Sequence, residues 1–300
     1  MPSSQQSIAL GLDIGGTRIK SVAVDHRYQI LSQHKLDSQA KNGPRAVRKA
    51  IGETIAHYKL NGIAFSSIGI GCAGSVEPKT GIVRNSPNFA DWSNVDLKTE
   101  IERDFGVTTT VENDANCAAY SEWKMGRGRG HDNLVLLTLG TGIGGGFILN
   151  GNLYRGSTGT GGELGHLSIY ANGVPCPCGN RGCFERYCSA SSLMKSLPEY
   201  SAKEIFSRAA EQPFKSLISQ FMADFSVGLT SIANVFDPSL ILLGGGLSQG
   251  VSQYLDQLQT WVQKNAFPAV GANVSIAMTE HLNLSGALGA ACIALEQSEC

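Results

Sequence analysis

The chain has 300 residues, enough for two ordinary domains, and a globular composition of 42% hydrophobic and 16% charged residues with 36 glycines. Its formal charge of −1, without a run of Lys or Arg, argues against a nucleic-acid partner. The polar start MPSSQQS and the lack of a long apolar run argue against a secretory leader and a membrane span, so we expect a cytoplasmic protein with reduced cysteines.

The first part of the chain alternates short buried strands with amphipathic helices. Two strands joined by the turn IGGT open it, and a third run completes a meander. Pro44 begins a helix, because apolar residues recur after it at helical spacing. The predicted strands are 8–13, 19–25, 28–34, 66–74 and 107–112, and the predicted helices are 44–58 and 115–125.

The pattern then restarts. At an offset of 125 residues, Leu12 to Gly16 falls on Leu137 to Thr141, so both halves read as strand, glycine-rich turn, strand. The later strands are predicted at 133–140, 239–247 and 273–278, and the later helices at 213–236, 251–265 and 284–297. We expect an N-terminal α/β domain of residues 1–118 plus 284–300, to which the last helix returns. The second α/β domain would be 119–283.

Four residues within 163–185 have the spacing of a zinc site. His166, Cys176, Cys178 and Cys183 offer three thiolates and an imidazole, the ligands of a tetrahedral structural Zn²⁺. A disulfide with one spare thiol is the alternative. Two acids, Glu163 and Glu185, bracket the set, so a bound metal would hold a loop that carries two carboxylates around a polar ligand.

Three glycine-rich loops each follow a predicted strand: DIGGT, TLGTGIGGG and LLGGGLS. Glycine lets backbone N–H groups approach phosphate oxygens. The alternative is that the glycines serve only to form a tight hairpin turn. Three such loops, two of them in equivalent places of a repeat, favour a nucleotide held between two domains. Asp13, beside the first loop, would suit Mg²⁺ directly or through water, or would cap the turn.

Over almost its whole length the chain resembles the ROK family of sugar kinases and repressors, within the hexokinase/actin-like ATPase superfamily. The resemblance rests on DIGGT, GIGCAG, ENDAN, LGTGIGGG, ELGH, CPCGNRGCFE and LLGGG. It implies a two-domain actin-like ATPase (ribonuclease H-like) fold with ATP and sugar in the interdomain cleft. Within the family, the stretch GRGHDNLVLLTLGTGIGGG resembles the bacterial glucokinases.

The resemblance also implies roles for individual residues. Asp114 matches the catalytic base. The sugar contacts would be Gly74, Asn88, Asn113, Asp114, Glu163, His166 and Glu185. The nucleotide-binding residues would be Asp13, Gly15, Gly16, Thr17, Gly140, Thr141, Gly142, Gly244, Gly245 and Gly246. Cys72 and Ala73 stand where a Pro-Gly pair ending at Gly74 is common, and this leaves the rigidity of that loop in doubt.

Asp114 ends a strand and begins a helix, where an N-cap is the simpler interpretation. A helix N-terminus favours the carboxylate form, so we expect Asp114 to be ionised, to orient the sugar 6-hydroxyl and to accept its proton late. His166 would bind zinc through one nitrogen and leave the other near the sugar.

The expected activity is transfer of the ATP γ-phosphate to the 6-hydroxyl of glucose. N-acetylglucosamine or N-acetylmannosamine is the alternative acceptor, and mannose or fructose is less favoured. A sugar-sensing repressor is disfavoured, because about seven residues precede the first strand and leave no room for a helix-turn-helix. A filament-forming or chaperone-type ATPase is disfavoured by the cysteine cluster and the paired glutamates. We expect a homodimer.

Overall fold

The computed structural model describes residues 7–86, 89, 91–281 and 283–298. The chain forms two compact units: the first comprises 1–129, 155–161 and 283–300, and the second 130–154 and 162–282. The predicted boundary at residue 118 lies inside helix α3 (Asp114–Lys124), which packs as one body with the first unit. The crossing falls between Arg129 and Gly130, within the glycine-rich stretch 125–130, where the sequence also indicates a junction. The return of 155–161 to the first unit is not predicted by the sequence.

The first unit is built on a five-stranded sheet in the order β3-β2-β1-β4-β8. Strands β1, β2 and β3 form an antiparallel meander, and β4 and β8 run parallel to β1. The bounds are β1 Ile8–Ile14, β2 Arg18–Asp25, β3 Ile30–Asp37, β4 Ser67–Cys72 and β8 Thr108–Asn113. The third strand starts two residues later than predicted, because Tyr28 has φ 61° and belongs to the turn.

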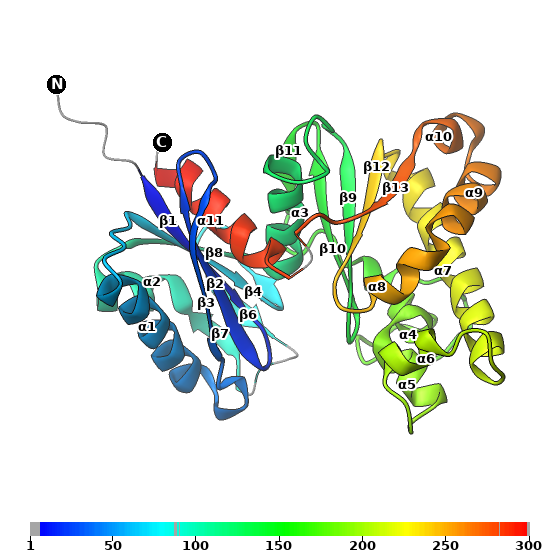
Figure 1. Cartoon of the computed structure of the whole chain (residues 1–300), viewed down its shortest axis with the longest axis horizontal. Helices are drawn as coiled ribbons and strands as arrows, with labels where there is room; N and C mark the ends of the chain where they lie inside the picture. Colours follow the sequence, from blue (N-terminus) through cyan, green and yellow to red (C-terminus); the bar gives the residue numbers. More distant parts are fainter. Residues whose placement is uncertain (1–6, 87–88, 90, 282, 299–300) are drawn as a thin grey trace. The chain divides into compact units, whose positions relative to one another are not determined.

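Helices cover both faces of this sheet (Figure 1). Strand β1 alternates: Leu10 and Leu12 join the core under α1 (Pro44–Leu60), whereas Ala9 joins the core under α11 (Ser285–Ser298). The predicted return of the last helix to the first unit is therefore confirmed. Gly11 lets α11 approach closely, since a Cβ there would lie 2.8 Å from the Ala291 Cβ. The remaining elements are η1 Ala40–Asn42, β5 Ser75–Val76, β6 Ile82–Asn85, β7 Ser93–Asp96 and α2 Leu97–Phe105.

The second unit repeats the same sheet. Its order is β11-β10-β9-β12-β13, with β9 to β11 antiparallel and β12 and β13 parallel to β9. The bounds are β9 Leu134–Leu139, β10 Ile143–Leu149, β11 Asn152–Tyr154, β12 Leu240–Gly244 and β13 Ser275–Met278. The repeat at an offset of 125 residues is confirmed, because it carries β1 and β2 onto β9 and β10.

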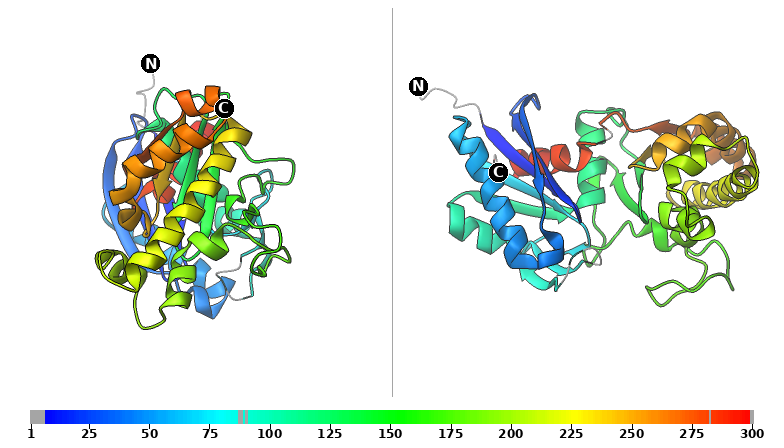
Figure 2. Two further views of the ribbon diagram at one scale, coloured as in Figure 1. Left: turned by 90° about the vertical axis from the view of Figure 1, so that its right-hand side faces the viewer. Right: turned by 60° about the horizontal axis from the view of Figure 1, so that its bottom comes forward.

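In the second unit, α7 and α9 pack side by side (Figure 2). Their buried faces share one core with β9 and β12. The predicted helix 251–265 is broken into α8, η3 and α9. No helix in the described part of the chain is both long and apolar enough to cross a membrane. The bounds are η2 Leu164–His166, α4 Glu185–Cys188, α5 Ala190–Ser196, α6 Ala202–Ser207, α7 Phe214–Phe236, α8 Ser248–Val251, η3 Ser252–Tyr254, α9 Leu255–Asn265 and α10 Pro268–Asn273.

Candidate active site

The carboxyl ends of three parallel strands bring distant residues of the first unit together. In the ladder, Asp13 of β1 lies opposite Gly71 of β4, and Gly71 lies opposite Glu112 of β8. The segments that follow these strands carry Gly15, Gly74 and Asp114. Ligands of open α/β sheets bind at this edge. The structure thus gathers the predicted residues of the first unit at one edge, apart from Asn88, which lies outside the described residues.

Asn113, not Asp114, is the N-cap of α3. Its Oδ1 accepts hydrogen bonds from the backbone N–H groups of Ala115 (2.9 Å) and Asn116 (3.1 Å). Its Nδ2 donates to the Gly74 carbonyl at 3.1 Å, which ties the loop after β4 to the helix. The side chain predicted to contact the sugar is therefore already engaged in shaping the site.

Asp114 is half-buried at the first helical position, and its Oδ1 accepts from the Ala115 N–H at 2.9 Å. The sequence shows only the helix N-terminus, which favours the ionised form of Asp114. Burial acts in the opposite direction and is the larger effect, so the pKa of Asp114 is raised. A raised pKa makes this carboxylate a better proton acceptor than the sequence suggests.

Asp13 is the second perturbed acid on this edge. Burial, followed by the negative charge of Asp114, raises its pKa to about 6, while Lys20 opposes the shift from 3.9 Å. The side chain stays 20% exposed. A carboxylate with access to water fits one ligand position of Mg²⁺, an ion that keeps most of its waters.

The first two glycine loops are tight turns with exposed tips. The Gly15 N–H donates to the Arg18 carbonyl at 2.9 Å, leaving Gly16 and Thr17 exposed. In the second unit the Gly140 N–H donates to the Gly142 carbonyl at 3.0 Å, leaving Thr141 exposed.

The third loop, Gly244 to Gly246, lies beside the second. Gly244 pairs with Thr138 in the ladder, and the Leu247 N–H donates to the Leu139 carbonyl at 3.0 Å. Gly245 has φ 87°, a conformation that favours glycine. Two of the three predicted phosphate loops thus share one edge of the second sheet.

His166, Cys176, Cys178 and Cys183 form a compact cluster whose ligand atoms all lie within 4.8 Å of one another. The Sγ atoms of Cys178 and Cys183 are 3.7 Å apart, and all three cysteines are free, so the alternative of a disulfide is not supported. Gly179 (φ 93°) and Gly182 (φ 73°) turn the chain back onto the cluster. Three thiols and one imidazole fit the donor set of a structural zinc site.

The two acids lie at the imidazole. Nε2 of His166 is 3.9 Å from the Glu163 carboxylate, while Nδ1 is 3.7 Å from Cys176 Sγ and 3.9 Å from Glu185 Oε1. One ring nitrogen therefore faces the thiols and the other faces Glu163. The Glu163 side chain is 54% exposed and that of Glu185 22%, so both can meet a polar ligand.

Two supports of this cluster are not apparent from the sequence. A Cβ on Gly142 would lie 2.5 Å from Glu185 Oε2, so the second glycine loop abuts this acid. The cysteine loop is also anchored to α7, because the Tyr170 hydroxyl donates to the buried carboxylate of Asp224 at 2.6 Å. A lone Asp on an amphipathic helix gives no sequence signal for this contact.

Comparison with known proteins identifies the family of the chain. Residues 9–297 match the model of the ROK family. The chain is 34% identical to the glucokinase of Thermotoga maritima, over 96% of this chain and 97% of that one. It is 31% identical to the xylose repressor of Bacillus subtilis, over 96% of this chain and 77% of the repressor.

Among solved structures, a ROK family glucokinase from Streptomyces griseus, in complex with glucose and AMPPNP, has a TM-score of 0.83 at 31% identity, over 97% of this chain and 100% of that one. The expected α/β fold of the actin-like ATPase type is thereby confirmed. With a family match from residue 9 to residue 297, the chain belongs to the ROK family.

Proposed function

We propose that the protein is an ATP-dependent glucokinase, which transfers the γ-phosphate of ATP to the 6-hydroxyl of glucose. The observation that carries the proposal is the half-buried Asp114 at the N-terminus of α3, on the same sheet edge as Asp13, in a chain similar to glucokinases over nearly its whole length. The Streptomyces griseus relative, which holds glucose and AMPPNP, supports this choice of acceptor and donor.

Asp114 orients the 6-hydroxyl and takes its proton. The sugar oxygen forms a bond to the γ-phosphorus as the bond from that phosphorus to the bridging oxygen of ADP breaks, and the hydroxyl proton passes to Asp114. Because the transition state is largely dissociative, this proton moves late. The raised pKa of Asp114 favours accepting it. Asn113 shapes the site by fixing the Gly74 loop.

Glu163 and Glu185 accept hydrogen bonds from ring hydroxyls, and Nε2 of His166 faces the same ligand. Carboxylate acceptors reject sugars that lack the matching hydroxyl more strongly than an apolar wall does. Asn88 is assigned to the sugar by resemblance alone. The three thiols and Nδ1 of His166 would hold a structural Zn²⁺ that keeps the two acids in place.

The nucleotide binds through backbone N–H groups of the three glycine loops, whose residues Gly16, Thr17, Thr141 and Gly246 are exposed. Gly140 and Gly246 have open space where a side chain would project. Asp13 would hold Mg²⁺, directly or through water; when bound, the ion neutralises phosphate charge.

The test is release of ADP in the presence of Mg²⁺ and ATP with glucose, N-acetylglucosamine, N-acetylmannosamine, mannose and fructose. A kcat/KM for glucose at least about tenfold above the others would establish a glucokinase, a margin that one mismatched contact supplies. Preference for an acetamido sugar would keep the mechanism and change the substrate. Absence of turnover with every sugar would contradict the proposal.

A sugar-sensing repressor is the second candidate, since the chain is similar to xylose repressors. The chain is 34% identical to the Thermotoga maritima glucokinase and 31% identical to these repressors, and turnover of a sugar in the assay above would decide for the kinase. A homodimer in the cytoplasm is part of the proposal. Sedimentation of the purified protein tests the dimer.

A further inference from the structure

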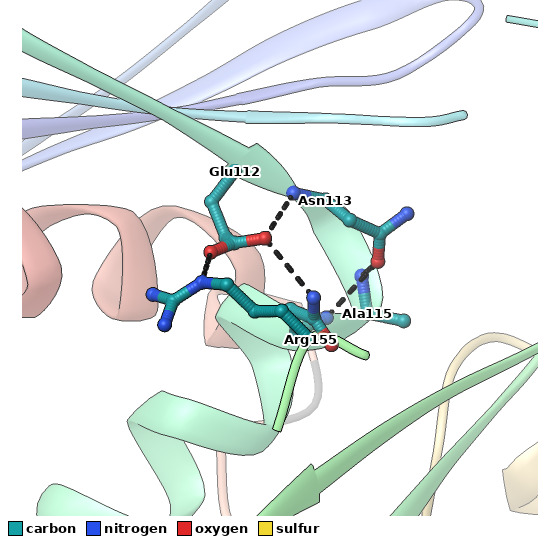
Figure 3. A network of polar contacts seen from close by, with 5 residues as sticks. Glu112, Asn113, Ala115 and Arg155 are labelled. Atoms are coloured by element: carbon teal, nitrogen blue, oxygen red, sulfur yellow. Dashed lines mark hydrogen bonds and ion pairs between the residues drawn. The ribbon is translucent and has the colours of Figure 1, made fainter. Parts of the chain in front are cut away.

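Glu112, the residue before Asn113, carries a buried carboxylate whose two oxygens are both engaged. It is 4% exposed at the end of β8. Figure 3 shows the network: one oxygen accepts from the Asn113 backbone N–H and from Asn116 Nδ2, each at 3.0 Å. The other accepts from Arg155 Nε at 2.6 Å. A buried carboxylate is unfavourable without a counter-charge, and Arg155 supplies it.

Arg155 reaches Glu112 because the chain leaves the second unit for one short segment. Residues 155–161 belong to the first unit, although the residues on either side belong to the second. The Gly161 N–H donates to the Arg155 carbonyl at 2.9 Å and closes the segment into a loop. The loop is packed tightly, since a Cβ on Gly159 would lie 2.6 Å from Pro78 Cδ. Glu163 lies two residues after the end of this loop.

Glu112 controls how the first turn of α3 meets β8. It holds the backbone of Asn113 and the side chain of Asn116, which flank Asp114 on both sides. Asn116 is itself 1% exposed, so water does not compete for its hydrogen bond with Glu112. If the carboxylate turns away, the first turn loses a strand-side anchor and the direction of the Asp114 side chain is no longer fixed.

We infer that Arg155 is a positioning residue for phosphoryl transfer: by pairing with Glu112, it fixes the orientation in which Asp114 meets the acceptor hydroxyl. The inference rests on the proposed function for its catalytic readout. Arg155 acts through Glu112 and is not assigned to the substrate. Burial raises the pKa of the Cys117 thiol, the carboxylates Glu112, Asp114 and Asp13 add to that shift, and Arg155 opposes it. Its cation thus belongs to the same crowded edge.

Arg155→Ala is the primary variant, and Arg48→Ala is its matched control. Arg48 pairs with Glu100 at 3.0 Å in the same unit, and its side chain is 31% exposed, against 30% for Arg155. For Arg155→Ala we expect kcat with glucose to fall about 100-fold, the effect of a small misplacement of a reacting group, with the KM for ATP unchanged. Arg48→Ala should keep the wild-type kcat.

Chemical rescue separates positioning from simple destabilisation. A cavity of about 140 Å³ adjoins the pair and is lined by Glu112, Arg155 and Thr110. Millimolar guanidinium should enter the space left in Arg155→Ala, pair with Glu112 and restore kcat about tenfold. It should not raise kcat of the wild type or of Arg48→Ala. A folded Arg155→Ala with normal kcat, or one that guanidinium does not rescue, would overturn the inference.

Hydrogen–deuterium exchange of amides 113–118 in the free protein tests the same inference without turnover. Faster exchange in Arg155→Ala than in Arg48→Ala is expected, and equal exchange would overturn it. If Arg155→Ala does not fold, Arg155→Lys takes its place: it keeps the charge, and kcat should fall about tenfold because an ammonium cannot reproduce the guanidinium geometry. A wild-type kcat in that variant would refute the inference. Failure of the wild type to phosphorylate glucose would contradict the proposed function alone, since the exchange comparison still decides the positioning.

Discussion

The two units share one sheet topology but fix their acids in different ways. In the first unit, Asp13, Glu112 and Asp114 follow or end parallel strands, so the backbone ladder sets their places. In the second unit the residue equivalent to Asp13 is Thr138, and the acids Glu163 and Glu185 lie at the two ends of the loop that carries the cluster of His166 and three cysteines. Under the proposed function, the same scaffold would present strand-fixed acids for the chemistry and loop-fixed acids for sugar recognition.

Asp114→Asn should give the largest effect, because it removes the proton acceptor. The amide oxygen of the new side chain can still accept the hydrogen bond from the Ala115 N–H. We expect kcat to fall about 1,000-fold, within the range of general-base catalysis, while glucose affinity measured by calorimetry stays within a few-fold. Asp256→Asn, an exposed acid in the first turn of α9, is the control and should be neutral. An active Asp114→Asn protein would refute the role.

Removing the cluster should disable the loop-fixed acids and spare the strand-fixed ones. Cys178→Ser or chelation is expected to raise the KM for glucose about 10- to 100-fold, the effect of losing support around a metal ligand, with little change in ATP binding. Metal content and kinetics are measured together on each protein. Cys292→Ser, a buried thiol of α11, should keep the metal. Full activity in metal-free protein would contradict this division between the units.

Asp13→Asn should stabilise the first unit while impairing catalysis. A carboxyl whose folded pKa is raised to about 6 costs stability when ionised; the cost is full above pH 6 and disappears as pH falls toward the unfolded value of 3.8. The shift corresponds to about 3 kcal/mol, and we expect about 2 kcal/mol because a fifth of the side chain meets water.

The measurement is thermal unfolding of Asp13→Asn and wild type from pH 4 to pH 8. The gain in Tm should be largest at pH 8 and close to zero at pH 4. Thr138→Val at the equivalent place in the second unit is the control and should show no such pH dependence. A gain independent of pH would mean that Asp13 is not the titrating group.

The sequence predicted what is local or periodic. Strand–glycine–strand patterns located both sheets, and the spacing of His166 and the cysteines located the cluster. What it missed depends on long-range pairing. Nothing in the sequence around Arg155 predicts its ion pair with Glu112, because that pair forms only when residues 155–161 return to the first unit. In the same way, nothing around Asp224, one polar residue on a long helix, predicts its hydrogen bond with Tyr170.

The electrostatics were missed for the same reason. The helix N-terminus at Asp114 is visible in the sequence, whereas the burial that raises its pKa is set by packing around the sheet edge. The crossing after Arg129 lies within the interval 115–130 that the glycine-rich stretch indicates in the sequence, and α3 keeps residues up to Lys124 in the first unit.

The smallest effects are expected from two alanine variants of the second glycine loop, Gly142→Ala and Gly140→Ala. They distinguish contact with Glu185 from binding of phosphate. Gly142→Ala places a methyl group 2.5 Å from Glu185 Oε2, so the acid must move, and the KM for glucose should rise about tenfold. Gly140→Ala meets nothing within 4 Å and should leave both the KM for glucose and the stability unchanged. If the loop binds phosphate, the methyl group of Gly140→Ala obstructs the nucleotide and raises the KM for ATP a few-fold. Equal effects of the two variants on both KM values would show that the loop does not divide its contacts between Glu185 and the nucleotide.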